Sequence, residues 1–170
     1  MKSLVQQRIS GSEEELNYLH ELHKWIPCRD QTRPIMNIYE KKITDIQIRQ
    51  DQYDTKEDEI LIEYFKYESI INYKTMKLKS KFPLNGERKY IFIPNEYPYQ
   101  VPENTFHYVL WYSYLDVDKD NITHDVMNAL KKICSDKIFE YVWYENPSMS
   151  VPEVYHVQVF WHYVNNNNIK

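Results

Sequence analysis

The chain has 170 residues, of which 42% are hydrophobic and 15% aromatic, including sixteen tyrosines and four tryptophans. This length and composition favour one domain with a single core, despite a mean hydropathy of −0.71, and exclude a chain that is disordered throughout. The formal net charge of −4 argues against nonspecific binding to a nucleic-acid backbone, which requires a cationic surface.

Glycine and cysteine usage restricts the function further. The only glycines are Gly11 and Gly86, which excludes phosphate-binding loops and dinucleotide fingerprints because these need several glycines. Cys28 and Cys134 lie far apart and lack metal-ligand spacing, so we interpret both as reduced structural thiols. No apolar run is long enough to span a bilayer and no signal-peptide pattern is present, so we expect a soluble cytoplasmic protein.

The first half of the chain predicts helices. A capping box at Ser12 opens a helix over residues 12–24, and a short amphipathic helix is expected over residues 35–43. Thr55 and Asp58 form a second capping box, and the apolar spacing that follows predicts a long helix to about Lys79. We therefore expect a helical part over about residues 12–82.

The second half predicts strands around one helix, after a turn at Asn85-Gly86. In chain order the expected strand, strand, helix, strand and strand cover Tyr90–Ile93, His107–Leu115, His124–Phe139, Glu140–Glu145 and Val154–Tyr163. The fold class is therefore α+β, with N-terminal helices followed by a β-β-α-β-β antiparallel sheet over residues 83–163. We expect a single domain over residues 1–170 with a frayed tail at residues 164–170.

The last expected strand carries polar and apolar residues on opposite faces. Because side chains alternate along a strand, His156, Gln158 and His162 share one face. The apolar residues between them share the other face, which resembles a core face. One face of this strand is thus a candidate wall of a functional site.

Three segments of the second half resemble the fungal family of N-acetylglucosamine-induced proteins, a domain of unknown function. They are YIFIPNEYPY, FHYVLWYSY and VWYENPSMSVPEVYHVQVF, and they occur in the order of the family motifs "lPNdfPY", "HlvvWsk" and "vlWfkNPpslkSvp.v.HvHV". The resemblance covers roughly residues 40–163. Where the family has His-x-His, this chain has His156-x-Gln158, so any chemistry that needs a histidine at position 158 is put in doubt.

The same order of motifs is similar to the histidine triad superfamily of nucleotide hydrolases and transferases, in which a strand histidine attacks the α-phosphate. By position, Gln158 stands where that nucleophile would be. A glutamine amide does not serve as this nucleophile, but it can donate a hydrogen bond to a phosphate oxygen. The resemblance therefore implies binding, or a different mechanism, in preference to nucleotidyl transfer.

These observations predict a sheet-face pocket for a small phosphoester, either a nucleotide or a nucleotide-sugar-like compound, with residual hydrolase or transferase chemistry left open. His156 is the candidate catalytic acid, base or nucleophile. The expected ligand-binding residues are Asn95, Tyr97, His107, Trp111, Asn146, Ser148, Ser150 and Gln158. His107 and Trp111 join this set if their strand pairs with the strand of His156.

Each of these residues also has an ordinary structural explanation. Strand histidines often bond to backbone, and aromatic residues more often fill a core than bind a ligand. Asn95 and the Asn146-Pro147-Ser148 segment are also typical of rigid turns. The alternative function is a noncatalytic interaction module that presents the aromatic sheet to a protein or an RNA end.

No metal site or cofactor is predicted. His20 and His23 lack further ligands at suitable spacing, and a His107/His156 pair has no supporting motif. The acidic run over residues 51–59 is interpreted as a solvated linker and helix start. Ligand identity, oligomeric state and protein partners are not determined by these patterns.

Overall fold

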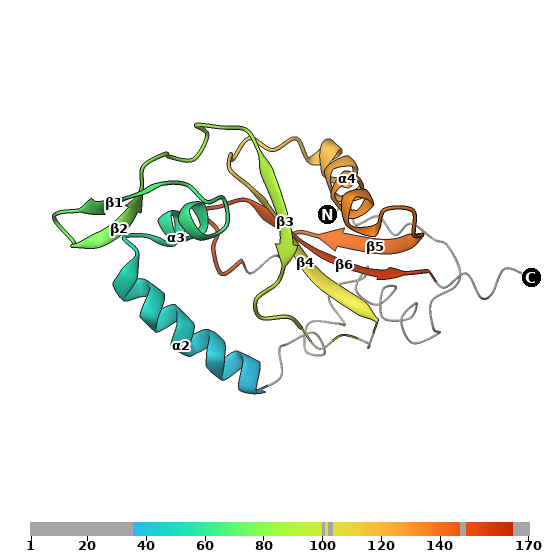
Figure 1. Cartoon of the computed structure of the whole chain (residues 1–170), viewed down its shortest axis with the longest axis horizontal. Helices are drawn as coiled ribbons and strands as arrows, with labels where there is room; N and C mark the ends of the chain where they lie inside the picture. The colour runs from blue at the N-terminus through green and yellow to red at the C-terminus, as the bar shows by residue number, and fades with distance from the viewer. Residues whose placement is uncertain (1–35, 100, 102–103, 147–148, 165–170) are drawn as a thin grey trace, which may run out of the picture.

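A computed structural model describes residues 36–99, 101, 104–146 and 149–164. In these ranges two helices come first, and four strands, a helical segment and two more strands follow, as Figure 1 shows. In order, the elements are α2 (Met36–Gln52), α3 (Lys56–Glu63), β1 (Ser69–Asn72), β2 (Lys77–Ser80), β3 (Tyr90–Pro94), β4 (Thr105–Tyr112), the short 3₁₀-helix η2 (Lys119–Asn121), α4 (Ile122–Cys134), β5 (Phe139–Tyr144) and β6 (His156–Tyr163). The described chain is α+β, as predicted.

The main sheet has four antiparallel strands in the order β3-β4-β6-β5. Its central pair is β4 and β6, in which Val109 lies opposite Gln158 and Trp111 lies opposite His156. The sequence analysis had left this pairing open, and the structure shows that the two strands do pair. It places the polar face of the last strand beside the histidine-tryptophan face of β4.

The two faces of the sheet are covered differently. Helix α4 packs its buried stripe, which includes Val126 and Leu130, against the face that carries Val157, Val159 and Trp161. Helix α3 packs on the opposite face. Figure 1 shows α4 on one side of the sheet and α3 beside the β1–β2 hairpin at the other end of the molecule.

Helix α3 joins the opposite face through a second apolar cluster. Ile60, Leu61 and Phe65 pack with Val109 and Trp111 of β4. The predicted capping box is confirmed, because the Thr55 hydroxyl accepts a hydrogen bond of 3.0 Å from the Asp58 amide. The helix is thus started locally by its cap and held by apolar packing.

The long helix predicted to about Lys79 is wrong. Helix α3 ends at Glu63, and residues 69–80 form the two-stranded β1–β2 hairpin. Lys66 adopts a φ of 59°, in the left-handed region, which does not continue a helix. Asp58 then holds the hairpin on α3, since its Oδ1 accepts a bond of 2.8 Å from the Ser80 amide.

The other predictions differ from the structure mainly at element ends. The short helix expected over 35–43 is the 17-residue α2. The strand expected to end at Leu115 ends at Tyr112, and the helix expected to Phe139 ends at Cys134. The predicted helix at 12–24 lies outside the described residues, as does the tail beyond Val164.

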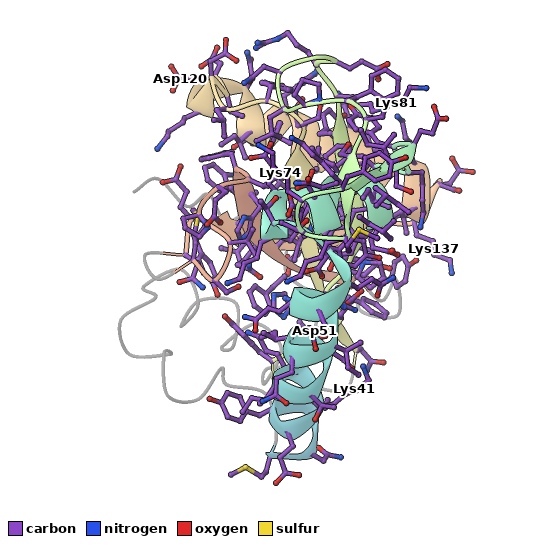
Figure 2. The ribbon with its side chains drawn as sticks, turned by 90° about the vertical axis from the view of Figure 1, so that its left-hand side faces the viewer. Lys41, Asp51, Lys74, Lys81, Asp120 and Lys137 are labelled. Atoms are coloured by element: carbon purple, nitrogen blue, oxygen red, sulfur yellow. The ribbon has the colours of Figure 1, made fainter. Side chains whose placement is uncertain are left out.

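Helix α2 is the most exposed α-helix of the described chain. It has no buried residue and runs away from the sheet and α4 in two perpendicular views (Figures 1 and 2). Lys41 lies toward its outer half and Asp51 near the end that joins the body (Figure 2). Across the described ranges, no helix combines the length and apolarity needed to cross a membrane.

Candidate functional site

A cavity of about 650 Å³ lies between α2, α3 and the face of the sheet opposite α4. Its volume is within the range of small-molecule sites. Most of the predicted ligand-binding residues line it: Asn95, Tyr97, Trp111, Asn146, Ser150, His156 and Gln158. The structure therefore brings together residues that are up to about sixty positions apart in sequence.

His107 does not line the cavity, but it is hydrogen-bonded to Gln158, which does. Its Nδ1 accepts a hydrogen bond of 3.1 Å from the Tyr99 amide, so the proton of the neutral ring is on Nε2. That Nε2–H donates to Gln158 Oε1 at 2.6 Å, and the Asn95 amide nitrogen lies 3.4 Å from the same oxygen. These two contacts occupy the Gln158 oxygen. The groups that Gln158 can still offer to a ligand in the cavity are therefore its amide N–H donors.

Burial keeps the His107 ring neutral. The ring is stacked on Phe160, with centroids 4.2 Å apart, and lies almost wholly out of solvent. Desolvation lowers the pKa of His107 to about 4, although the hydrogen bond to Gln158 acts in the opposite direction. At neutral pH this residue is a hydrogen-bond donor with a fixed direction.

His156 has the opposite tautomer. Its Nδ1 lies 2.8 Å from the Val154 carbonyl oxygen and must donate to it, so Nε2 carries the lone pair. Trp111 stacks on the ring at 4.1 Å, and burial lowers the pKa of His156 despite the bond to Val154. A neutral acceptor, His156, therefore lies beside an amide donor, Gln158, on the cavity wall.

Trp111 is held by aromatic contacts on the cavity wall. His156 covers it on one side, and the Tyr64 ring packs at 5.4 Å with an interplanar angle of 51°. Trp111 thus orients the His156 imidazole and forms part of the cavity wall.

Helix α2 supplies a charged wall that the sequence analysis did not identify. Tyr39, Lys42, Ile46 and Arg49 line the cavity, and their spacing of three, four and three residues places them on one helical face. Helical periodicity was the signal for them, but the expected helix ended at Ile43. The basic residues of the site therefore come from a helix and not from the strands.

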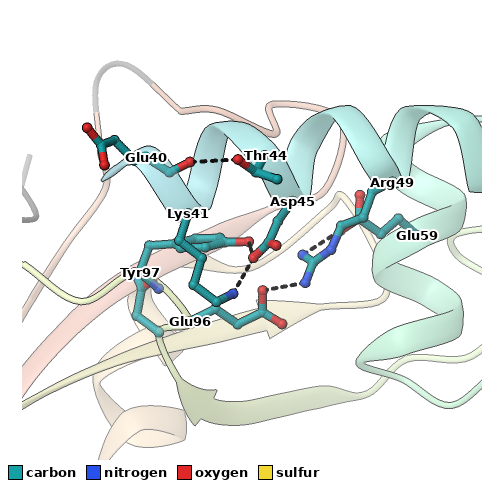
Figure 3. Close-up of polar contacts among 9 residues, drawn as sticks. Glu40, Lys41, Thr44, Asp45, Arg49, Glu59, Glu96 and Tyr97 are labelled. Atoms are coloured by element: carbon teal, nitrogen blue, oxygen red, sulfur yellow. Dashed lines mark hydrogen bonds and ion pairs between the residues drawn. The ribbon is translucent and has the colours of Figure 1, made fainter. Parts of the chain in front are cut away.

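Arg49 ties α2 to the body of the protein. Its guanidinium donates to Glu59 of α3 at 2.9 Å and to Glu96, in the loop after β3, at 2.8 Å (Figure 3). The acidic run over residues 51–59, predicted to be solvated, thus contributes Glu59 to an ion pair at the cavity. Asp45 adds a second tie, because it accepts a hydrogen bond of 2.8 Å from the Tyr97 hydroxyl.

Two lysines complete the charged wall. Lys56, the first residue of α3, donates to the Ser150 carbonyl at 2.9 Å, and Lys42 approaches the Tyr97 ring at 5.9 Å. Burial, and secondly the charge of Lys56, lower the pKa of Lys42. The two ammonium groups are therefore close enough to repel each other.

The remaining predicted residues are not among the described residues that line the cavity. His162 is on the polar face of β6 but pairs with Glu140, at 3.1 Å, away from the cavity. Ser148, His20 and His23 lie outside the described residues. Within the described ranges no three acidic, histidine or cysteine residues group as metal ligands, and both His107 nitrogens are already hydrogen-bonded.

The family model described as "Protein of unknown function (DUF3605)" matches residues 31–162. The chain belongs to this family. The matched range begins before α2 and ends in β6, so every described residue that lines the cavity lies within the family region.

One solved structure similar to this DUF3605 protein is described as "Crystal Structure of HTC1". The two share 14% identity with a TM-score of 0.49, over 88% of this chain and 84% of that chain. No curated protein matches the sequence.

Proposed function

We propose that the cavity binds a small phosphoester ligand of the nucleotide or nucleotide-sugar class. The observation that carries the proposal is the arrangement of the cavity wall. Two lysines, Lys42 and Lys56, face the same 650 Å³ space as a fixed acceptor on His156 and a fixed donor on Gln158. Phosphate oxygens pair with ammonium groups, and uncharged donors and acceptors recognise the remainder of such a ligand.

The hydrogen-bond pattern favours binding over nucleotidyl transfer. Gln158, which stands at the position of the histidine triad nucleophile, has its oxygen held by His107. His156 keeps an unprotonated Nε2 on the cavity side, so it is the group able to accept a proton if a reaction occurs there. The resemblances to N-acetylglucosamine-induced proteins and to the histidine triad superfamily are part of what supports this proposal.

A noncatalytic interaction module is not favoured by any described contact. Trp111, the tryptophan on the cavity wall, has one ring face covered by His156, and the cavity is large enough for a small molecule. We place the protein in the cytoplasm on its cysteine usage, with Cys134 buried as a free thiol.

The test is a thermal-shift series with nucleotides, sugar phosphates and sugar nucleotides on wild type and His156→Asn. The asparagine Nδ2 replaces the imidazole Nδ1 as donor to the Val154 carbonyl, while the Nε2 acceptor is lost. We expect at least one phosphoester to raise the wild-type melting temperature by several degrees, and the variant to lose most of that rise.

The matched control is His124→Asn, an exposed histidine on α4 outside this cavity, which should respond as wild type does. The proposal fails if no compound in the series stabilises the wild-type protein. It also fails if His156→Asn and His124→Asn retain the same ligand response.

A further inference from the structure

We propose that Lys42 and Lys56 form a subsite for a dianionic phosphate monoester, so that the ligand carries a terminal phosphate group. This inference rests on the proposed function and names the class of its ligand. It follows from the charges that line the cavity, taken one by one.

The charged residues on the cavity wall are Lys42, Arg49, Lys56, Glu59 and Glu96. Arg49 pairs with both carboxylates, Glu59 at 2.9 Å and Glu96 at 2.8 Å, so each carboxylate has Arg49, and not a lysine, as its ion-pair partner. Among the described residues, neither Lys42 nor Lys56 makes an ion pair with a carboxylate.

Asp45, one helical turn along α2 from Lys42, is already engaged. Asp45 pairs with Lys41 of the same helix and accepts the Tyr97 hydroxyl (Figure 3). The contacts of Lys42 and Lys56 are instead with uncharged groups, the Tyr97 ring and the Ser150 carbonyl. Neither ammonium group is therefore paired with a carboxylate of the described chain, and the three cations and two carboxylates of the cavity wall leave it with a net charge of +1.

Two ammonium groups on one cavity wall, neither paired with a carboxylate, can pair with the two negative charges of a single ligand group. Their mutual repulsion and the desolvation of Lys42 both act against the charged form. A monoanion, such as a phosphodiester, compensates one of the two charges, whereas a phosphate monoester carries nearly two charges above its second pKa of about 6. The dianion relieves the repulsion that the empty site retains.

The strand side of the cavity wall indicates where the part of the ligand without the phosphate lies. His156 is neutral and Gln158 is an amide, so the strand side of the cavity offers single hydrogen bonds and no charge. That side suits an uncharged hydroxyl or ring group. The cavity is thus polarised, with the phosphate on the helix side and the uncharged portion on the strand side.

The experiment compares affinities at pH 8, where monoesters are dianionic, by isothermal titration at constant ionic strength. The probes are inorganic phosphate, adenosine and uridine 5′-monophosphates, glucose 6-phosphate, the cyclic 3′,5′-diesters of the two nucleotides, and malonate as a dianion without phosphorus. We expect at least one monoester to bind about tenfold or more tightly than the diesters and malonate.

Lys42→Met and Lys56→Met, which keep an apolar stem, should each remove that preference and leave the weak diester affinity unchanged. The matched control is Lys41→Met, because Lys41 lies over the same Tyr97 ring at 5.4 Å but pairs with Asp45 and does not line the cavity. This variant should bind as wild type does.

Equal affinity for monoesters and diesters overturns the inference while leaving phosphoester binding intact. A preference that survives in both lysine variants also overturns it, as does binding of malonate as tight as that of the best monoester. Absence of binding by every phosphoester, including the sugar nucleotides of the first series, overturns the proposed function together with this inference.

Discussion

The two histidines of the site show how neighbours decide the chemistry of one residue type. His107 is protonated on Nε2 because the Tyr99 amide occupies its Nδ1, and His156 is protonated on Nδ1 because the Val154 carbonyl accepts from it. The first ring becomes a donor to Gln158, and the second becomes an acceptor in the cavity. The face alternation of the strands predicts that these residues meet, but not which proton each one carries.

Burial of His107 should make the protein sensitive to acid. Its pKa is about 4 in the folded chain, against 6.5 for an unperturbed histidine, so the unfolded chain binds the proton first as pH falls. Stability due to this group is therefore complete above pH 6.5 and is lost down to about pH 4. Between pH 7.5 and 4.5 the loss is roughly 2 to 3 kcal/mol of unfolding free energy.

Urea denaturation of wild type and His107→Gln at these two pH values measures the effect. Glutamine still donates to Gln158 but does not titrate, so the variant should lose about 2 to 3 kcal/mol less than wild type on acidification. His124→Gln, at an exposed position, is the control and should follow wild type. Parallel pH profiles for all three proteins would contradict the assignment.

At the scale of elements, α2 is the least anchored part of the described fold. It has no buried residue, and its interactions with the body are polar: Arg49 with Glu59 and Glu96, Asp45 with Tyr97, and Lys77 with the Gln50 carbonyl. Helices held by few apolar contacts open more readily than core elements. The wall that carries Lys42 should therefore be the most dynamic part of the site.

Hydrogen exchange with mass-spectrometric readout tests this expectation. Amides of residues 36–52 should exchange faster than those of β6, and Arg49→Met should accelerate exchange in α2 by about tenfold, since two partly buried ion pairs are removed. Lys41→Met removes only an exposed pair within the helix and should change little. Unchanged α2 exchange in Arg49→Met would show that other contacts hold the helix.

At the scale of the molecule, one apolar cluster joins the helical part to the sheet. Ile60, Leu61 and Phe65 of the α3 region pack with Val109 and Trp111 of β4, and Val154 is buried among them. A cluster shared in this way couples the two parts. The prediction of a single domain therefore becomes a prediction of one cooperative unfolding transition.

Thermal or urea unfolding followed by tryptophan fluorescence and far-ultraviolet circular dichroism should give coincident transitions. Leu61→Ala, at a side chain that is 1% exposed, should lower the unfolding free energy by about 2 to 5 kcal/mol in both signals. Ile48→Ala, at a position 58% exposed on α2, should change it by less than about 0.5 kcal/mol. Two separate transitions would show that the helical part and the sheet unfold independently.

Local sequence patterns predicted much of this fold, and their failures have physical reasons. The β-β-α-β-β order and the Thr55–Asp58 cap follow from side-chain alternation and short-range hydrogen bonding. The hairpin at residues 69–80 was missed because Tyr64, Tyr67 and Ile71 continue the helical spacing of α3, yet Ile71 is half-exposed in the structure. No local sequence pattern indicates that Lys66 adopts a positive φ, a backbone conformation that does not continue a helix.

The sequence by itself determined which side chains share a strand face, because alternation is a property of the extended backbone. It therefore placed Trp111 of β4, and His156 and Gln158 of β6, on faces that line the cavity, whereas Asn95, in the loop after β3, came from the motif resemblance. Only the tertiary structure decided that α2 and α3 place Lys42 and Lys56 opposite them. Charge compensation depends on distances between distant segments, so which lysines lack a carboxylate partner is decided only when the chain is folded.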